Sequence, residues 1–551
     1  MKYLKNVAKQ MTARATSQSQ PIPGSGQVAN SSGGFTWAVD DWTRLQRFLI
    51  LGSDSGSYYA SPQKLTAENA NAVLNCIAAD GARTVREIVE ISQSGRAPKN
   101  DPALLALALC TAKGDEATRK LALDALPQVA RTGTHLMHFA EFVNATRGWG
   151  RGLRRAVGNW YNQKPVRDVA YQALKYQARD GWSHRDLLRL AHPQPASDEH
   201  RTVYHWITQG WDSVGPEPHP VGALQQIWAF ERAKSAKTAD EVAMLILDYK
   251  LPREAVPTQF LTEKVVWEAL LEAMPMTAMI RNLATLTRIG LLETGSPATR
   301  KVVEQITDGQ WLRKARVHPL VLLMALKTYA SGRGVRGTNS WTPVTAIIDA
   351  LDKAFYASFE NVKPTGSRTL LALDVSGSME LSEIGGMAAL TPRVASAAMA
   401  LVTAAIEPHH EIVAFTSAPN GYGGQWGGGA PGLTPLSISP RQRLDDVVKK
   451  ASDLPLGGTD CAQPMLWALK EKKKFDTFIV YTDNETWHGK IHPAQALRKY
   501  REQTGINAKL IVVGMVSNGF SIADPKDAGM LDVVGFDTAT PQLMADFMRM
   551  S

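Results

Sequence analysis

Apolar residues follow a helical spacing from Phe35 to about residue 360, with no strand-like alternation among them. Three clear examples are Pro102–Ala112, Glu241–Tyr249 and Pro319–Tyr329, which are amphipathic or largely apolar. Helices joined by short turns, without a strict repeat length, are typical of a degenerate α-solenoid of the HEAT kind. The first two thirds of the chain therefore predict a helical array.

Several helix beginnings are marked by side chains that cap the first turn. Thr84–Glu87 and Thr238–Glu241 have the form of capping boxes. Asp101-Pro102 and Ser296-Pro297 combine an N-cap residue with proline at the first helical position. We expect helices to begin at these four places.

The pattern changes after residues 361–368, which have the composition of a linker. Short apolar runs now alternate with helical segments, which indicates a parallel, doubly wound α/β sheet. The predicted strands are Leu370–Leu373, Glu411–Phe415, Thr477–Tyr481, Lys509–Val513 and Asp532–Phe536. The predicted helices are Gly385–Ile406, Arg441–Ser452, Ala462–Lys474 and Pro493–Glu502. The glycine-rich stretch Asn420–Gly432 is either an inserted surface loop, which we favour, or a mobile loop near the site described below.

The composition is that of a globular protein of more than one domain: 551 residues, 44% hydrophobic and 21% charged, with a formal net charge of +9. This charge is compatible with a polyanionic partner. Three cysteines without a Cys-x-x-Cys pair predict neither a zinc site nor a disulfide framework, so we expect a reducing, cytoplasmic location. No apolar run is long enough to span a bilayer, so we expect no membrane partner.

The first 35 residues contain no acidic residue; the first is Asp40. Their cations and their Ser, Thr and Gln content fit either an organelle transit peptide or a disordered basic tail, and we favour the tail because residues 21–34 resemble a flexible linker. We therefore divide the chain into a disordered tail (1–35), a helical array (36–362) and an α/β domain (363–551).

Asp374, Ser376 and Ser378 follow the first predicted strand of the α/β domain as Asp-x-Ser-x-Ser. The carboxyl ends of strands are where open α/β sheets bind ligands. A carboxylate and two hydroxyls are hard oxygen ligands of the kind that Mg²⁺ or Ca²⁺ prefers. The motif alone is weak, since a polar turn before a helix has the same form.

Two further segments strengthen the metal interpretation. Thr459 lies in a Gly-Gly-Thr-Asp loop before a helix, and Asp483 ends another apolar run, so three loops converge on one edge of the sheet. The constellation closely resembles the metal-ion-dependent adhesion site of the von Willebrand factor A domain. The resemblance implies a divalent cation, most simply Mg²⁺ with Ca²⁺ as the second choice, held by Asp374, Ser376, Ser378, Thr459 and Asp483. The alternative is a collapsed site without an ion.

Between Arg147 and His192 the chain has ten Lys and Arg against three Asp, a net charge of +7. Aromatic residues are interleaved with these cations: Trp149, Trp160, Tyr161, Tyr171, Tyr176 and Trp182. Cations neutralise phosphates, and aromatic rings stack on unpaired bases. The alternative is that the rings form helix-packing core and the cations a solvated face. Our candidate RNA-binding residues here are Arg147, Arg151, Arg154, Arg155, Lys175, Arg179 and His192.

Spacing suggests how some of these residues lie. Lys175 and Arg179 are four apart, so a continuous helix would place both on one face. Ser183–Asp186 predicts a second helix beginning, whose N–H groups could meet a phosphate. His192 follows that helix and could equally be its C-cap, while His184 could be only part of the turn.

The order of a basic helical array followed by an adhesion-type domain resembles the Ro autoantigen family, with its TROVE module, and most of all its bacterial Ro-sixty-related members. Besides the ion-site residues, two stretches carry this resemblance, Trp37–Tyr59 and Gly148–His192, and it covers roughly residues 35–551.

The resemblance implies a ring-shaped, monomeric HEAT-like array that the A domain closes. It implies that Y RNA binds the outer surface, at Lys175, Arg179 and His192, and that single-stranded 3′ ends of misfolded or immature structured RNA enter the central hole. It also implies a role in RNA quality control, with Y RNA tethering polynucleotide phosphorylase.

Two other functions are compatible with parts of the sequence. The chain could be a metal-dependent protein-interaction module whose ion captures an acidic residue of a partner. A metal-dependent hydrolase is disfavoured because two-metal sites need more carboxylates than Asp374 and Asp483 supply. His488 and His492 lack the His-Glu-x-x-His arrangement of a zinc hydrolase. We therefore expect no enzymatic activity.

Overall fold

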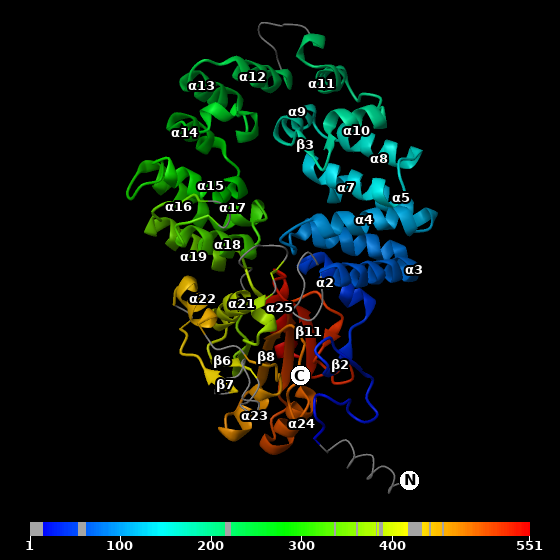
Figure 1. Ribbon diagram of the computed structural model, residues 1–551, viewed down its shortest axis with the longest axis vertical. Helices are drawn as coiled ribbons and strands as arrows, with labels where there is room; N and C mark the ends of the chain where they lie inside the picture. Colours follow the sequence, from blue (N-terminus) through cyan, green and yellow to red (C-terminus); the bar gives the residue numbers. More distant parts are fainter. Residues whose placement is uncertain are drawn as a thin grey trace.

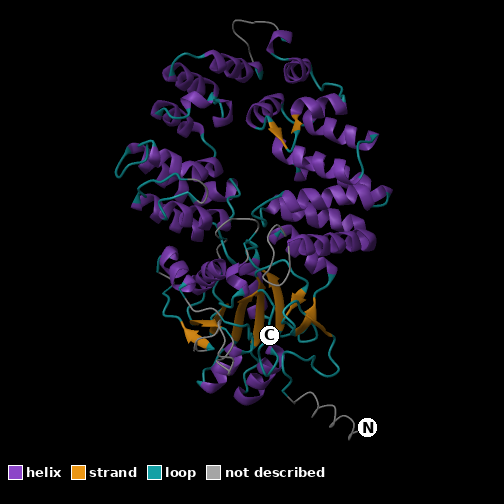
Figure 2. Ribbon diagram, in the orientation of Figure 1, coloured by secondary structure: helices purple, strands orange, loops and turns teal. Residues whose placement is uncertain are grey.

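The computed structural model describes residues 15–52, 62–214, 222–334, 338–359, 362–381, 383–384, 390–416, 432–439, 442–453 and 457–550. Helices rise in one arm from α2 to α11 and return in a second arm from α12 to α19, and both arms end on an α/β domain (Figure 1). Figure 2 shows that nearly all strands lie in that domain. This confirms the predicted order of a helical array followed by an α/β domain.

The first arm consists of α2 (Asp41–Leu51), α3 (Pro62–Ser94), α4 (Asp101–Lys113), α5 (Glu116–Asp124), α6 (Leu126–Val129), α7 (Gly133–Thr146), α8 (Arg151–Asn162), α9 (Val166–Lys175), the hairpin β3 (Ala178–Arg179) and β4 (Trp182–Ser183), α10 (His184–Ala191) and α11 (Asp198–Gln209). The second arm consists of α12 (Leu224–Ser235), α13 (Ala239–Tyr249), α14 (Lys264–Ala273), α15 (Met276–Arg288), α16 (Pro297–Thr307), α17 (Gly309–Lys314), α18 (Pro319–Ala330) and α19 (Thr345–Ala357). One continuous apolar core runs through both arms.

Two of the predicted helix beginnings are confirmed, and a third is displaced by one residue. The side chain of Thr238 accepts a hydrogen bond from the N–H of Glu241, and Ser296 caps α16 ahead of its proline. Asp101 is the first residue of α4 rather than its cap, which is Asn100. Side-chain caps like those of Thr238 and Ser296 each stabilise a helix by about 1 kcal/mol.

The beginning predicted at Thr84 is wrong. The backbone of α3 is interrupted at Asp80, whose φ is −158°. The Asp80 carboxylate accepts a hydrogen bond from the N–H of Arg83 at 2.8 Å, and the Thr84 hydroxyl donates to the Asp80 carbonyl at 2.9 Å. The second half of α3 therefore begins at Asp80, and Thr84 lies within its first turns.

The α/β domain has a six-stranded sheet in the order β11-β9-β8-β5-β6-β7. Its strands are β5 (Thr369–Asp374), β6 (His410–Phe415), β7 (Leu433–Pro435), β8 (Thr477–Thr482), β9 (Lys509–Gly514) and β11 (Met530–Val534). All pair in parallel except β7, an antiparallel edge strand that the sequence did not predict. The described helices are α20 (Ser378–Leu381), α21 (Pro392–Ile406), α22 (Leu444–Ser452), α23 (Gln463–Lys470), α24 (Pro493–Thr504) and α25 (Thr540–Arg549).

Helices cover both faces of this sheet, as a doubly wound fold requires. Alternate side chains of β5 enter two different cores. Leu371 and Leu373 join the core that contains α21 and continues into the helical arms. Leu370 and Ala372 join a separate core with residues of α23 and α24. Residues 420–431 of the glycine-rich stretch lie outside the described part of the chain. So do residues 53–59, the end of the Trp37–Tyr59 stretch that carries the family resemblance.

The prediction that residues 1–35 form a disordered tail is wrong for residues 15–35. Strands β1 (Gln27–Ala29) and β2 (Phe35–Ala38) pair with each other, and β2 pairs with β10 (Phe520–Ser521) of the α/β domain. We call residues 15–38 the N-terminal segment. Its order comes from partners nearly 500 positions away, so its own polar sequence gave no sign of it. Residues 1–14 lie outside the description.

Polar contacts join both arms to the α/β domain, and those of the first arm are largely buried. From the first arm, the Arg47 guanidinium donates to the Asp532 carboxylate at 2.6 Å and to the Asn518 carbonyl at 2.9 Å. From the second arm, Asp349 pairs with Arg443. These contacts close the helical array on the domain.

The ends of the two arms also meet each other. The ring of the buried His318, at the beginning of α18, hydrogen-bonds the carbonyl of Arg96 in the first arm at 3.0 Å. The Arg96 guanidinium in turn pairs with Asp537 of the α/β domain at 2.5 Å. Three parts of the chain therefore share one polar junction.

Within the described residues, no helix combines the length and apolar character needed to cross a bilayer. Cys76, Cys110 and Cys461 are buried free thiols.

Candidate ion site and basic surface

Two neighbouring strands deliver the two predicted carboxylates to the same edge of the sheet. β5 ends at Asp374, and β8 ends one residue before Asp483. The two strands are parallel, with Leu373 opposite Tyr481, so the loops that follow them leave side by side. Thr459 comes from a third loop. Its carbonyl accepts a hydrogen bond at 3.2 Å from the N–H of Trp487, which lies four residues beyond Asp483. The predicted convergence of three loops is therefore present.

All five predicted ligand residues are buried, and none is more than 2% exposed. The Asp374 carboxylate accepts hydrogen bonds from the Ser376 N–H at 2.9 Å and from the Thr482 hydroxyl at 2.6 Å. The hydroxyls of Ser376 and Ser378 lie 3.1 Å apart. One oxygen of Asp483 accepts from the N–H of Glu485 at 2.9 Å. The residues are thus held in place by the loops that carry them.

The remaining oxygens fit a divalent cation. Within the described part of the chain, Thr459 Oγ1 and Asp483 Oδ2 are buried without a hydrogen-bond partner. Burial, and then the charge of Asp483, raises the pKa of Asp374 to about 7, and burial also raises the pKa of Asp483. Two buried carboxylates that disfavour each other's charge are stabilised by a cation between them. Carboxylates and hydroxyls are the hard donors that Mg²⁺ and Ca²⁺ take.

Among the described residues there is no group of three or more His, Cys, Asp and Glu side chains that could hold a metal. The sequence raised His488 and His492 as possible ligands. The ring of His492 instead hydrogen-bonds the Gln20 carbonyl at 2.8 Å and the Gln27 amide at 3.2 Å, so it anchors the N-terminal segment.

The N-terminal segment packs against the ion-site loops. The sequence did not predict this contact. Gln18 is fully buried, and its amide nitrogen donates to the Asp460 carboxylate at 2.7 Å. Its amide oxygen accepts from the Thr486 hydroxyl at 2.5 Å. Gly34 approaches so closely that a β-carbon would lie 2.0 Å from the Thr486 carbonyl oxygen. A glutamine in a Ser- and Gln-rich stretch carries no sequence signal for such a role.

The basic surface is built mainly on α8. Arg151, Arg154 and Arg155 are exposed on one side of this helix, while Leu153 and Trp160 are buried on the other. The described contacts give none of these three arginines an ion pair. Arg147, at the C-cap of α7, donates to the Thr111 carbonyl at 2.6 Å and so has one donor already committed.

The second group of cations is arranged differently from the prediction. Lys175 is the last residue of α9, and Arg179 lies on β3, so the expectation that both share one helix face is wrong. Tyr176, with φ −119° and ψ 62°, ends the helix between them. The Arg179 side chain is 60% exposed. His192 is exposed and is the left-handed C-cap of α10, which confirms the C-cap alternative for this residue.

The interleaved aromatic residues divide into two classes. Trp160 and Tyr161 are fully buried in the core. For these two residues, the alternative prediction of helix-packing rings is therefore confirmed. The Tyr161 hydroxyl hydrogen-bonds His184 at 2.7 Å, and burial lowers the pKa of that histidine to about 4, so His184 belongs to the core rather than to a surface turn. Tyr171 and Tyr176 are only half-buried, and the Lys175 ammonium lies 5.4 and 5.5 Å from their ring centres.

The predicted capping box before α10 is confirmed. The Ser183 side chain accepts from the Asp186 N–H, and the Asp186 carboxylate accepts from the Ser183 N–H at 3.0 Å. Because these N–H groups are already paired, this helix beginning has less to offer a phosphate than the sequence suggested.

Comparisons with known proteins place both halves of the chain. Residues 28–214 and 244–328 match the TROVE domain family, and residues 368–548 match the Ro60 vWA domain family. The chain is 44% identical over 525 residues to the RNA-binding protein RO60 of Deinococcus radiodurans, covering 95% of each. It is 36% identical over 597 residues to the RNA-binding protein RO60 of Caenorhabditis elegans, covering 95% of this chain and 90% of the other. The crystal structure of the Deinococcus radiodurans RO (RSR) protein matches with a TM-score of 0.68 at 44% identity, covering 93% of this chain and 99% of that one.

Proposed function

Because the chain belongs to the Ro60 protein family, we propose that it is an RNA-binding protein in which the helical array holds RNA and the vWA domain holds a divalent cation. The single observation that carries the RNA proposal is the set of exposed, unpaired arginines on α8, Arg151, Arg154 and Arg155. Exposed cations without acidic partners are available to phosphates, and each phosphate that they neutralise releases counterions.

We further propose where RNA lies and what it is. Y RNA binds the outer surface near Lys175, Arg179 and His192, and single-stranded 3′ ends of misfolded or immature RNA enter the central hole that the family resemblance implies. The protein then scaffolds polynucleotide phosphorylase through the Y RNA. These finer assignments are supported by the family resemblance and by the exposure of Arg179 and His192.

The direct test of the outer-surface assignment is charge reversal. K175E/R179E should abolish retention of a Y-like stem-loop RNA in a gel shift. The matched control is R498E/K499E, which reverses two exposed cations on α24 that form no ion pair with the described residues and makes the same change in net charge. If both variants weaken binding equally, the effect reflects net charge alone and the assignment fails.

The second candidate function is metal-dependent protein binding, favoured by the two unpartnered buried oxygens at the ion site. We propose that Asp374, Ser376, Ser378, Thr459 and Asp483 hold Mg²⁺, and that an acidic residue of a partner completes its coordination. Asp374→Ala should reduce Mg²⁺ affinity in calorimetry by at least 100-fold while changing RNA affinity less than two-fold. Equal losses of both affinities would mean that the ion supports RNA binding instead.

We propose no catalytic step. The described site supplies two carboxylates and hydroxyls, and none of the relatives' names given above is that of an enzyme. Purified protein incubated with a 3′-tailed RNA and Mg²⁺ should leave its length unchanged. Shortening that Asp374→Ala removes would contradict this part of the proposal.

A further inference from the structure

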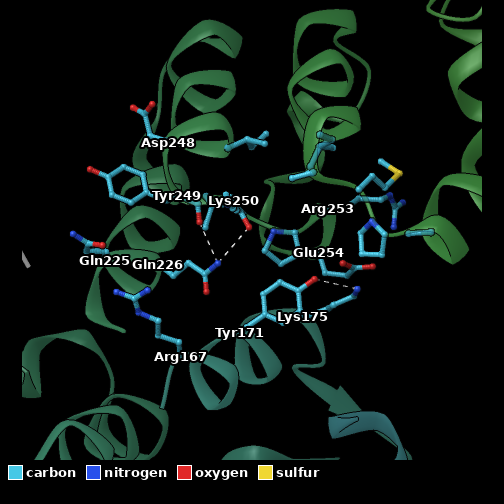
Figure 3. Close-up of a pocket in the computed structure, with 18 of the residues that line it drawn as sticks. Arg167, Tyr171, Lys175, Gln225, Gln226, Asp248, Tyr249, Lys250, Arg253 and Glu254 are labelled. Carbon is cyan, nitrogen blue, oxygen red and sulfur yellow. Dashed lines mark hydrogen bonds between the residues drawn. The ribbon is translucent and has the colours of Figure 1, made fainter. Parts of the chain in front are cut away.

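A pocket lies where the two arms approach each other, at the end away from the α/β domain. Its volume is about 490 Å³, within the range of about 300–1,000 Å³ usual for small-ligand sites. Figure 3 shows side chains of α9, α12 and α13 and of the turn 250–254 converging on it. Lys175, the last residue of α9, is among its lining residues.

Two tyrosines give the pocket aromatic walls whose positions are fixed. The Tyr171 hydroxyl accepts a hydrogen bond from the Lys175 ammonium at 3.3 Å. The Tyr249 ring packs on Trp228, with ring centres 5.6 Å apart. Both tyrosines are half-buried, so each can still present ring surface to a ligand. A base that stacks on a ring of this kind gains about 1–3 kcal/mol.

A glutamine supplies a hydrogen-bond acceptor of defined orientation. The Gln226 amide nitrogen donates to the carbonyls of Tyr249 at 3.1 Å and Lys250 at 3.3 Å. With the nitrogen committed to the backbone, the amide oxygen has no partner among the described contacts. In Figure 3 this amide lies centrally, between α9 and α13. Such an oxygen can accept a hydrogen bond from the N–H groups that nucleobases carry on their edges.

The charges at the pocket suit one phosphate rather than many. Four cations line it, Arg167, Lys175, Lys250 and Arg253, together with three acids, Asp168, Asp248 and Glu254. The net charge of +1 is small compared with the +7 of residues 147–192. A duplex backbone would favour a surface of uniform positive charge, whereas a single nucleotide needs one cation, a ring and an amide.

We propose that this pocket binds a single unpaired nucleotide of RNA held on the basic surface, with its base between Tyr171 and Tyr249 and its edge on Gln226. This inference rests on the proposed RNA-binding function. It adds a site at which an unpaired base is recognised. It also requires the bound RNA to have an unpaired nucleotide at the end of the arms away from the α/β domain.

The experiment uses a fluorescein-labelled hairpin RNA with an eight-nucleotide single-stranded 3′ extension, in fluorescence anisotropy at several salt concentrations. Tyr249→Ala should weaken binding by about 5- to 150-fold, the range of one lost stacked base. Gln226→Ala should weaken it by about 2- to 10-fold, the range of one lost hydrogen bond. The slope of log affinity against log salt should not change, because neither variant removes a charge. Tyr249→Phe, which keeps the ring, should bind like the wild type.

Two controls distinguish binding in the pocket from RNA binding elsewhere on the protein. Trp311→Ala removes an aromatic residue that is 49% exposed on α17, outside the pocket, and should leave binding unchanged. The fully paired hairpin should be bound equally by wild type and Tyr249→Ala. If Tyr249→Ala binds the tailed RNA like the wild type, the pocket inference is overturned while the RNA proposal stands. If the wild type binds neither RNA, the proposed function itself fails.

A second measurement does not depend on how the variants fold. RNA carrying 4-thiouridine in its extension should crosslink to peptides from 166–176 or 224–254 of the wild-type protein. AMP should compete only at millimolar concentration, because it lacks the contacts of the rest of the RNA. Crosslinks confined to other segments, or AMP binding at micromolar concentration without any effect on RNA affinity, would overturn the assignment.

Discussion

The ion site and the basic surface use polar side chains in opposite ways. At the ion site, polar groups from three loops and the N-terminal segment are buried and almost all are paired. On α8, the arginines are exposed and lack ion-pair partners among the described contacts. Buried polar groups depend on each partner, because an unpaired one is costly. Exposed cations cost little to leave unpaired, and so remain available for a polyanion.

This contrast predicts that equivalent substitutions have very different consequences in the two regions. A cation committed to buried partners should be essential for stability. A cation on the basic surface should be dispensable for stability but necessary for RNA binding. Three substitutions test how far the contrast holds, from the largest expected effect to the smallest.

Arg47→Ala should have the largest effect. This fully buried guanidinium pairs with Asp532 at 2.6 Å and donates to the Asn518 and Phe520 carbonyls at 2.9 and 2.8 Å. Its loss leaves partly buried acceptors unpaired, and removing one partner of a buried ion pair destabilises by about 3–5 kcal/mol. Thermal unfolding measures the loss. Arg119→Ala, at an exposed position on α5, is the matched control, with an expected change within about 0.5 kcal/mol.

If Arg47→Ala and Arg119→Ala melt at the same temperature, the junction between α2 and the α/β domain contributes nothing to stability. The contrast between buried and exposed cations would then be lost.

His318 should make the junction of the arms sensitive to acid. Burial lowers the pKa of His318 from 6.5 to about 4. Between these values the unfolded chain binds the proton and the folded chain does not, so stability is full above about pH 6.5 and falls as the pH decreases toward 4. The fall approaches about 3 kcal/mol, since one pKa unit corresponds to about 1.4 kcal/mol. Arg96 and Asp537 lie beside this ring, and both are unchanged in the His318→Gln variant described next.

The measurement is the unfolding temperature of wild type and His318→Gln between pH 7.5 and 4.5. The wild type should be the more stable at pH 7.5, and its advantage should shrink as the pH falls. A difference that does not depend on pH would show that His318 contributes no proton linkage. His184, whose pKa burial also lowers to about 4, remains in both proteins and cancels from the comparison.

Gln18→Ala should give the smallest of the three effects on stability and also alter the ion site. The Gln18 amide pairs with Asp460 and Thr486, next to the loops that carry Thr459 and Asp483. Its removal leaves buried groups unpaired, which costs about 1–3 kcal/mol, and it should weaken Mg²⁺ binding several-fold. Gln20→Ala, on an exposed side chain two residues away, is the control for both calorimetry and unfolding.

An unchanged Mg²⁺ affinity in Gln18→Ala would show that the N-terminal segment covers the ion-site loops without holding them in position.

The α/β domain could be predicted from sequence because its signals are local. β5 and β8 are unbroken apolar runs, buried throughout, and each brings an aspartate to its end. Parallel pairing then fixes Asp374 and Asp483 at one edge without any further information. The arginines of α8 were identified as candidates from the density of positive charge between Arg147 and His192, although no individual helix was predicted over these positions.

What the sequence did not predict depends on contacts between distant residues. The N-terminal segment is ordered by strand β10 and by Asp460 and Thr486, which no local pattern in residues 15–38 could indicate. The break between Lys175 and Arg179 arises because the chain turns into the β3–β4 hairpin, which the helical spacing concealed. The pocket needs α9 to meet α12 and α13, and it becomes visible only once the arms are placed.

The central claim is that exposed, unpaired arginines of the helical array bind RNA through its phosphates. The most direct measurement is the salt dependence of RNA affinity for the wild type, for R151A/R154A/R155A, and for the control R498A/K499A. Single-stranded RNA should lose a slope of about 0.7 for each phosphate contact removed, so the triple variant should lose about 2 and the control nothing. An affinity and slope unchanged in the triple variant would contradict the account.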